Sequence, residues 1–251
     1  MSKHFCPRKV ARIVLASTIL FGVLSLDARI FTSNTGDQIE GEFLSASPTN
    51  ANIKLVSGKV VAVPLSTFCD KDRLYITYRT IATEAERNKV LQFRIQATHT
   101  TKKSTDTLYQ IINTWSSGYK VNVENLLSLP IGELTIQYGI FKLDSEEGAK
   151  KTNAGEIDDS WGQTKIDFID VRNSFDFETI KMPMSSSKLK SGVVWAGGGK
   201  RQNSDALRGI WIRAYWKDLL VAEFKSSSRM DNDVWADSLR PPKISDQSFK
   251  E

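Results

Sequence analysis

The sequence predicts an all-β protein made of a small barrel followed by a β-sandwich. In residues 29–78, short stretches with apolar residues at every second position alternate with Gly, Asn and Ser turns. The same period of two, which is typical of strands, returns over residues 90–230. No long stretch with helical spacing interrupts this second series, so we expect strands to form its core.

The first 28 residues are predicted to be a secretory signal peptide. Basic residues precede an uncharged, mostly apolar run at 13–26, and Ala28 supplies a small residue at the expected cut. The run is shorter than the about 20 residues that span a bilayer, so we expect cleavage and no integral membrane segment afterwards. The protein is therefore expected to be exported to the periplasm, the cell surface or the medium.

The charge balance does not predict nucleic-acid binding. The chain carries a net charge of +5, of which +3 lies in residues 1–28 (four basic residues, one acidic), leaving +2 for the remainder. Such a balanced remainder gives little attraction to phosphate backbones. The pairs Lys102-Lys103 and Lys150-Lys151 are interpreted as solvated loop tips.

Cysteine and histidine contents exclude several kinds of site. Cys6 falls within the predicted signal peptide, so Cys69 alone remains and no intrachain disulfide is expected. Its neighbours Leu65 and Phe68 favour a buried thiol, with a reactive thiol as the alternative. His99 is the single histidine beyond residue 28. A zinc site with several His and Cys ligands is not expected, and no metal or cofactor is predicted.

Residues 29–78 read as strands at 29–32, 41–43, 52–56 and 59–63, closed by a small helix. Ser57-Gly58 predicts a tight turn, and Pro64 marks a strand end. Asp70 and Asp72 would lie at the positive end of the short helix. Such short strands bury their apolar side chains best by curling into a barrel.

These residues resemble the SLA homology domain. This family is known from a eukaryotic endocytic adaptor and recurs in exported proteins of planctomycete and verrucomicrobial bacteria. The matching elements are Arg29-x-Phe31-Thr32, Gly41-Glu42-Phe43, Gly58-Lys59-x-x-x-Val63-Pro64-Leu65 and Asp72-x-x-Tyr75-Ile76. Members carry Leu-Ser where this chain has Phe68-Cys69. The resemblance implies a Src-homology-3-like barrel, and the eukaryotic member binds a short peptide motif.

Residues 79–89 are predicted to be a linker, with a helical alternative starting near Thr83, and residues 90–230 to be the sandwich. Expected strands are 91–97, 119–125, 134–143, 165–171, 175–180, 192–196, 209–215 and 219–224, the last two joined by a hairpin at 216–218. Their pattern resembles immunoglobulin and fibronectin modules. Residues 148–162 are expected to form a polar loop, and 231–251 a disordered tail.

Three motifs are possible sites of chemistry. Gly197-Gly198-Gly199-Lys200 lacks the upstream Gly and the following Ser or Thr of a phosphate-binding loop, so we expect a flexible connection. His99 could act as a base for a serine nucleophile, but the chain has no Gly-x-Ser-x-Gly elbow, and a polar residue at a strand end is expected instead. Acidic groups at Glu156, Asp158-Asp159 and Asp231-Asn232-Asp233 lack the spacing of a calcium loop and are interpreted as solvated.

Two interpretations remain open for the strand at residues 209–215. One of its faces carries Trp211, Arg213 and Tyr215, and the other carries Ile210, Ile212 and Ala214. If the aliphatic face is core, the aromatic face is exposed and suits protein or carbohydrate contact. Alternatively, Trp211 and Tyr215 are themselves core.

The expected function is non-enzymatic. We expect an exported interaction or scaffold protein with protein or peptide partners and no assigned binding residue. The alternative is a carbohydrate-binding or carbohydrate-active protein that uses aromatic side chains of the sandwich. A peptide-sized apolar groove or an open strand edge would favour the first, and coplanar exposed rings beside carboxylates the second.

Overall fold

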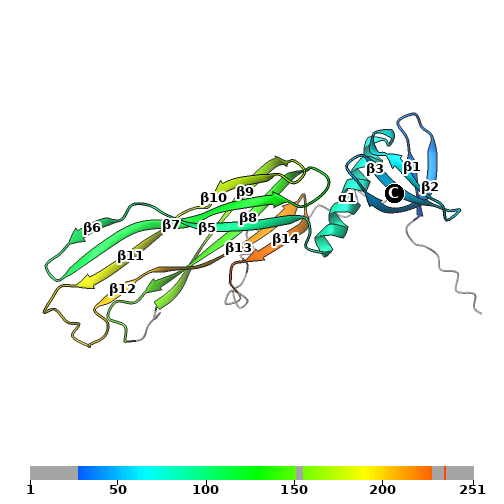
Figure 1. The fold of residues 1–251 in the computed structure, drawn as a ribbon. Helices are drawn as coiled ribbons and strands as arrows, with labels where there is room; N and C mark the ends of the chain where they lie inside the picture. Colours follow the sequence, from blue (N-terminus) through cyan, green and yellow to red (C-terminus); the bar gives the residue numbers. More distant parts are fainter. Residues whose placement is uncertain (1–27, 151–154, 228–234, 236–251) are drawn as a thin grey trace, which may run out of the picture.

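The computed structural model describes residues 28–150, 155–227 and 235. The predicted signal peptide lies outside these residues except for Ala28, and the predicted tail 231–251 lies outside them except for Trp235. Strands dominate the described part, which confirms the all-β class. Figure 1 shows an elongated molecule with a small sheet at one end, a helix beside it, and two larger sheets over the remaining length.

The small sheet is antiparallel, with its strands in sequence order. Its members are β1 (Ala28–Thr32), β2 (Gln38–Ala46), β3 (Asn50–Leu55) and β4 (Val60–Pro64). β1 and β4 are the outer strands and do not pair with each other, so the sheet is a curled half-barrel rather than a closed barrel. The 3-10 helix η1 (Leu65–Thr67) follows, and Phe68 forms a bridge with Ser33. The half-barrel core consists of Phe31, Ala51, Ile53, Phe68 and Ile76.

One helix, α1 (Asp70–Glu86), occupies both the predicted short helix and most of the predicted linker. The division expected between residues 78 and 79 therefore falls inside a single element, because no Gly or Pro interrupts this stretch. The helix ends where Asn88 adopts a left-handed φ of 54°. The N–H groups of Lys89 and Asn88 donate to the carbonyls of Glu84 and Ala85, the pattern of a Schellman motif. In the part of the chain that the structure describes, no helix is long and apolar enough to span a membrane.

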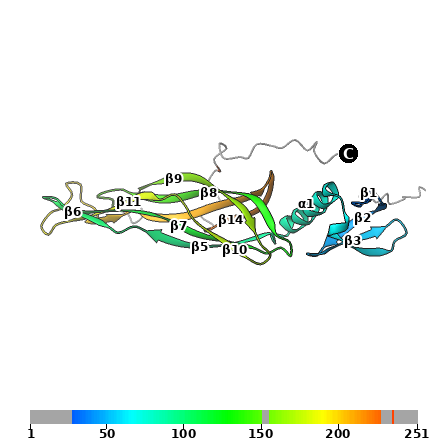
Figure 2. The same ribbon diagram turned by 90° about the horizontal axis from the view of Figure 1, so that it is seen from above.

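α1 contributes to two hydrophobic cores. Ile76 packs in the half-barrel core, whereas Ile81 is buried in the core of the larger sheets. Tyr78 adds a ring contact with Trp216 at 6.1 Å between centroids. Figure 2 shows the helix between the half-barrel and the two larger sheets.

The larger sheets form a two-layered β-sandwich. The central strand of the first sheet is β7 (Gln110–Asn125). Along one edge it pairs with β5 (Leu91–His99) and β6 (Lys103–Asp106), and along the other with β10 (Ser174–Glu178) and β11 (Met182–Leu189). The short strand β12 (Gln202–Ser204) pairs with β11. The second runs β14 (Leu219–Lys225), β13 (Ala206–Trp216), β8 (Ile131–Ser145), β9 (Gly155–Ile169). Alternate side chains from both sheets fill one core, including Val121, Val123, Ile136, Ile140, Ile210 and Ile212.

Several predicted boundaries in the sandwich are wrong. Residues 192–196 form turns rather than a strand, and residues 155–162 of the predicted loop belong to β9. β6, β11 and β12 were not predicted. β9 is an edge strand whose polar side chains face solvent, and β11 contains three consecutive serines. Both strands are therefore defined by main-chain pairing with their neighbours rather than by alternating apolar residues. The hairpin at 216–218 is confirmed between β13 and β14.

Candidate functional site

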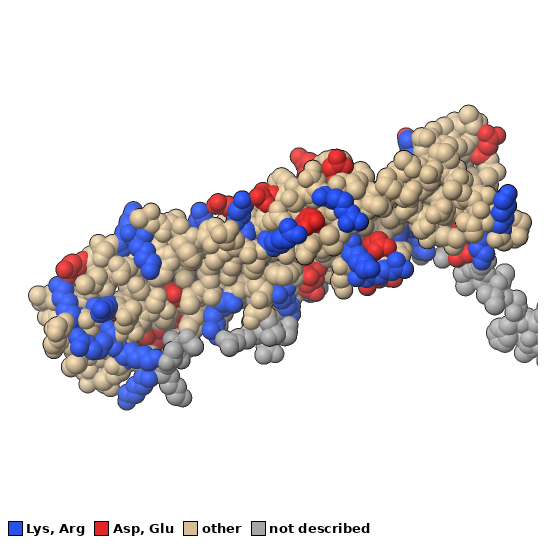
Figure 3. Space-filling model, in the orientation of Figure 1, with Lys and Arg blue, Asp and Glu red and all other residues tan. Residues whose placement is uncertain are grey.

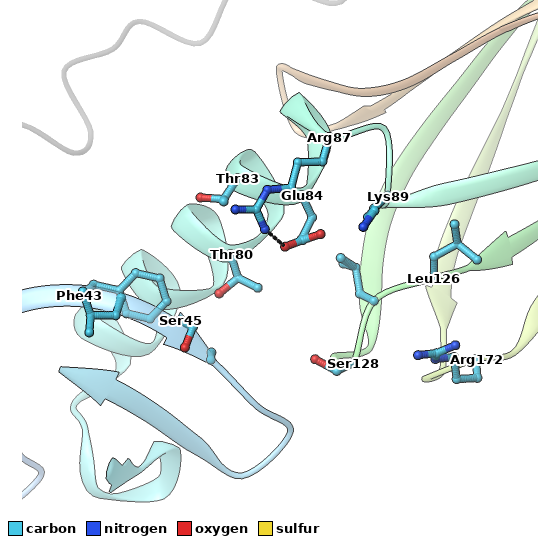
Figure 4. A pocket seen from close by; sticks show the side chains of 13 residues that line it. Phe43, Ser45, Thr80, Thr83, Glu84, Arg87, Lys89, Leu126, Ser128 and Arg172 are labelled. Atoms are coloured by element: carbon cyan, nitrogen blue, oxygen red, sulfur yellow. Dashed lines mark hydrogen bonds and ion pairs between the residues drawn. The ribbon is translucent and has the colours of Figure 1, made fainter. Parts of the chain in front are cut away.

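A groove of about 660 Å³ lies where the half-barrel, α1 and the sandwich meet (Figure 4). Segments far apart in the sequence form its walls, and each of the three parts of the molecule contributes. Its lining residues are Phe43, Leu44, Ser45 and Ala46 of β2; Thr80, Thr83 and Glu84 of α1; Arg87 and Lys89 after the helix; Leu126, Leu127 and Ser128 between β7 and β8; and Arg172 between β9 and β10. Its volume lies within the range of ligand-binding clefts.

The apolar part of the groove is shaped by an irregularity in β2. Pairing with β3 shifts register between Phe43 and Ser45, so Leu44 is an extra residue in the ladder. A bulge of this kind redirects a side chain out of the regular alternation. Leu44 is 46% exposed, and Phe43 is packed against the half-barrel core beside it.

The opposite wall is fixed by Asn125 at the end of β7. This side chain is fully buried, and its Nδ2 donates to the carbonyls of Leu129 and Ile169 at 2.9 and 3.3 Å. Its Oδ1 accepts the N–H of Leu127 at 2.9 Å. A buried amide with satisfied donors and acceptor defines a single conformation. Asn125 therefore holds the β7–β8 connection that carries Leu126 and Ser128.

The charged side chains of the groove are mainly cationic. Glu84 accepts a hydrogen bond from Arg87 at 3.0 Å, which neutralises that pair. Lys89 and Arg172 are exposed, and neither has an ion-pair partner among the residues that the structure describes. Figure 4 shows both beside the Leu126 and Ser128 wall. The groove thus combines apolar walls with excess positive charge.

His99 lies beside a serine, but the pair is not arranged for nucleophilic catalysis. Its Nδ1 is 2.7 Å from Ser117 Oγ, which also accepts the Trp115 Nε1 hydrogen at 2.9 Å. Ser117 has no exposed surface, so a substrate cannot reach it. Within the described residues no carboxylate is hydrogen-bonded to His99 to orient its ring. His99 is the last residue of β5, as predicted, and joins β5 to β7.

The acidic residues at 156–159 lie in β9 rather than in a loop. Asp158 and Asp159 point to opposite faces of the strand. Asp158 is 3.5 Å from Lys142, and Asp159 accepts a hydrogen bond from Trp161 at 3.0 Å. Residues 28–150, 155–227 and 235 contain no group of three His, Cys, Asp or Glu side chains that could hold a metal ion. Residues 231–233 lie outside this part of the chain.

The glycine loop at 197–199 is a folded connection. Trp195 Nε1 donates to the Lys200 carbonyl at 2.9 Å, and Gly198 and Gly199 have positive φ angles. A Cβ on Gly199 would lie 1.9 Å from the Gly148 carbonyl oxygen, so glycine permits close approach of the two backbones. Close packing therefore explains Gly199, and the positive φ angle explains Gly198.

The aromatic face of β13 is buried, which contradicts one of the two interpretations left open by the sequence. Trp211 and Tyr215 are 4% and 8% exposed. Trp211 nevertheless lies outside the main sandwich core that contains Ile210, Ile212 and Ala214. The aliphatic face is core, as expected, and the opposite face is covered by other residues.

Trp235 covers the Trp211 part of this face. Its ring contacts Trp161 at 4.9 Å and Trp211 at 5.1 Å, with interplanar angles of 74° and 76°. Gly139 lets the Trp161 ring lie over β8, since a Cβ there would meet ring atoms at 2.5 Å. Rings perpendicular to one another do not form the flat platform expected of a sugar site. Sequence reasoning missed this cluster because Trp235 lay in the predicted disordered tail, although a large aromatic residue is unusual in such a segment.

Cys69 is half-buried rather than fully buried. Its Sγ lies 3.5 Å from Oδ2 of Asp72. The other carboxylate oxygen of Asp72, Oδ1, accepts a hydrogen bond from Arg29. The thiol is thus part of the contact between β1 and the start of α1.

Comparisons of the chain with protein-family models, curated proteins and solved structures found no match.

Proposed function

We propose that this chain is a non-catalytic interaction protein that binds an extended peptide segment in the groove between the half-barrel and the sandwich. The peptide carries acidic side chains beside apolar ones. One observation carries the proposal, namely that apolar walls at Leu44 and Leu126 adjoin the cations Lys89 and Arg172. An acidic partner gains Coulomb attraction from both cations, while its apolar side chains cover exposed apolar surface.

Two further observations support a peptide partner. The groove is bordered by loop and helix residues from three parts of the molecule, which suits recognition of a chain rather than a compact metabolite. The resemblance of residues 29–78 to a family with a peptide-binding member points in the same direction. From the signal peptide predicted at residues 1–28, we further propose that this interaction takes place in the envelope or outside the cell.

The carbohydrate alternative has weaker support. It requires an exposed, flat aromatic surface, whereas Trp211 is 4% exposed and Trp235 stands at a steep angle to it. The coplanar rings beside carboxylates that this alternative predicts are not found on this face.

Fluorescence anisotropy with the full chain tests the proposal. The probes are a fluorescein-labelled hexapeptide that alternates Asp with Leu, and its counterpart that alternates Lys with Leu. The double variant K89E/R172E should bind the acidic peptide at least about tenfold more weakly, because two attractive charges become repulsive. The matched control K103E/K188E reverses two exposed lysines at the other end of the sandwich and should leave affinity unchanged.

A second pair of variants tests the apolar wall. Leu44→Asn should weaken binding of the acidic peptide, whereas Leu220→Asn, at a similarly exposed leucine on β14, should not. Equal affinity for the acidic and basic peptides would contradict the proposal. Binding of a soluble oligosaccharide that K89E/R172E leaves unchanged would favour the carbohydrate alternative.

A further inference from the structure

The end of the sandwich farthest from the half-barrel presents apolar side chains to solvent. Two of the connections at this end are residues 107–109 between β6 and β7 and residues 190–201 between β11 and β12 (Figure 1). They lie side by side, because the N–H of Lys190 donates to the Tyr109 carbonyl at 2.9 Å. Leu108, Tyr109 and Val194 are 76%, 62% and 74% exposed. We call these two connections the distal tip.

The distal tip has a defined structure. The Trp195 ring packs against Gly148 and donates from Nε1 to the Lys200 carbonyl, and the Lys200 N–H donates to the Ala149 carbonyl at 3.1 Å. The Lys190 ammonium lies 2.5 Å from Asp106. These contacts join the connection after β11 to the ends of β6 and β8. The exposed Val194 therefore belongs to a folded turn.

Positive charge is concentrated around the same end. Residues 100–110, 145–150 and 186–204 contain seven Lys or Arg and three Asp or Glu, a net +4 compared with +2 for the whole chain beyond residue 28. Figure 3 shows Lys and Arg gathered at the end of the molecule that carries β6, β11 and β12 in Figure 1. Lys103, Lys188 and Arg201 are exposed. The fold thus brings together basic residues that are scattered in the sequence.

We propose that the distal tip binds the surface of a lipid bilayer that contains anionic lipids. Leu108, Tyr109 and Val194 enter the interfacial region, while the surrounding cations contact lipid phosphates. Cations near an anionic leaflet are attracted to it, and apolar or aromatic side chains at the apex gain by leaving water. A soluble polyanion would use the cations alone and would leave the exposed apex without a role. A bilayer uses both features.

This surface is distinct from the peptide groove. The groove lies at the junction with α1, and the distal tip lies at the opposite end of the sandwich (Figure 1). A protein attached through the distal tip would hold its groove away from the membrane. The two proposals can therefore fail independently.

Vesicle co-sedimentation with the full chain tests the charge requirement. Vesicles of phosphatidylcholine alone are compared with vesicles in which about one third of the lipid is phosphatidylglycerol. K103E/K188E should bind the anionic vesicles at least about tenfold more weakly than the parent chain. K89E/R172E, with the same change in net charge at the groove, should bind within about twofold of the parent. All these chains share residues 1–28, so the apolar N-terminal run contributes equally to each.

Equal losses in the two double variants would overturn the proposal, since net charge alone would then govern binding. Equal binding of the parent chain to neutral and anionic vesicles would also overturn it. Displacement from anionic vesicles by millimolar inorganic phosphate at constant ionic strength would identify a free-phosphate site and overturn the membrane assignment.

A fluorescent label tests whether the apex contacts lipid. An environment-sensitive nitrobenzoxadiazole group is attached at Val194→Cys, or at Val56→Cys in the half-barrel, in chains with Cys6 and Cys69 replaced by Ser. Val56 is a matched control because it is also a valine with 74% exposure. With anionic vesicles, emission should increase and shift to the blue at position 194 and stay unchanged at position 56. An unchanged signal at position 194 in vesicle-bound protein would overturn the proposal.

Discussion

The half-barrel and the sandwich use α1 in different ways. In the half-barrel, the first turns of the helix bring a buried carboxylate, Asp72, into contact with β1. In the sandwich, the later turns contribute Ile81 and the partly buried Tyr78 to an apolar core. The smaller sheet buries few side chains, and its outer strands β1 and β4 do not pair with each other, so an ion pair and main-chain hydrogen bonds contribute more of its stability.

The contact with β1 centres on Asp72, which is 2% exposed. One of its oxygens is 2.6 Å from the Arg29 guanidinium, and the other accepts the Thr32 N–H at 2.6 Å. Arg29 also lies over the Tyr75 ring at 3.9 Å. A single helical side chain thus connects both ends of the edge strand β1 to α1. The sandwich has its own buried carboxylate, Asp205, which accepts the N–H of Ser145 in β8 at 3.0 Å and the N–H of Ser185 in β11 at 2.6 Å.

Removing Asp72 is expected to have the largest effect. Asp72→Ala leaves Arg29 and the Thr32 N–H without their partner and should lower the free energy of unfolding of the half-barrel by about 4 kcal/mol. Hydrogen exchange read by mass spectrometry should show faster exchange in β1–β4 and unchanged exchange in β7 and β8. Asp70→Ala, which removes a 91% exposed carboxylate paired with Arg73, should cost less than about 1 kcal/mol. Equal loss of protection in both sheets would show that they unfold as one unit.

Two isoleucines of α1 should separate the cores that the helix joins. Ile76→Ala and Ile81→Ala remove side chains of the same size, both 1% exposed, and each should cost about 3 kcal/mol through lost burial and a cavity. Ile76→Ala should increase exchange mainly in β1–β4, and Ile81→Ala mainly in β13 and β14. The comparison would fail if the two variants gave the same exchange pattern.

Asn125→Ala should have an intermediate effect, confined to the sandwich. It leaves the buried carbonyls of Leu129 and Ile169 without a donor, at an expected cost of about 2 kcal/mol in urea denaturation. Exchange should increase at residues 126–130, and affinity for the acidic peptide should fall because Leu126 loses its support. Asn122→Ala, which removes an exposed hydrogen bond to Asp176, is the control and should change neither property.

The smallest expected effect is a pH dependence at Glu223, on the aromatic face of the sandwich. Burial raises the pKa of this carboxyl, but hydrogen bonds from Arg213 and Trp211 and the charges of Arg213 and Lys225 outweigh burial, so the pKa lies below its ordinary value. The carboxylate therefore stabilises the fold above its ordinary pKa, and this contribution is lost as pH falls through the folded pKa.

Urea denaturation between about pH 6 and about pH 3 measures this contribution. The parent chain should lose more stability on acidification than Glu223→Gln. Glu40→Gln, at an exposed glutamate of the half-barrel, should follow the parent. A parent and a Glu223→Gln chain with identical pH profiles would contradict the assignment.

The strand signal was strongest where one face of a strand enters a core. Residues 91–97 alternate because one face of β5 is buried. Residues 134–143 and 209–215 lie in β8 and β13, where burial extends to both faces. The signal failed for β11, whose serines are fixed by pairing with β7 rather than by apolar alternation. The helical alternative for residues 79–89 agrees with α1, which continues to Glu86 and contributes to both cores.

Neither the groove nor the distal tip could be read from local patterns. Leu44, Lys89 and Arg172 lie far apart in sequence, and only the packing of β2, α1 and the sandwich loops brings them to one groove. Lys103, Lys188 and Arg201 were likewise unremarkable until β6, β11 and β12 were placed at one end. Trp235 shows the same limit, since its partners Trp161 and Trp211 come from two other strands.

The amino-acid sequence alone is enough to predict the all-β class and the early strands of the half-barrel, and it contains no recognisable catalytic motif. These properties depend on residue types and short-range periodicity, which a linear pattern records directly. Tertiary structure decided that the barrel stays open, that α1 belongs to two cores, that Trp235 covers the aromatic face, and where the cations gather. Those outcomes depend on contacts between segments distant in the chain, whose closeness is set by packing of the whole molecule rather than by any local stretch.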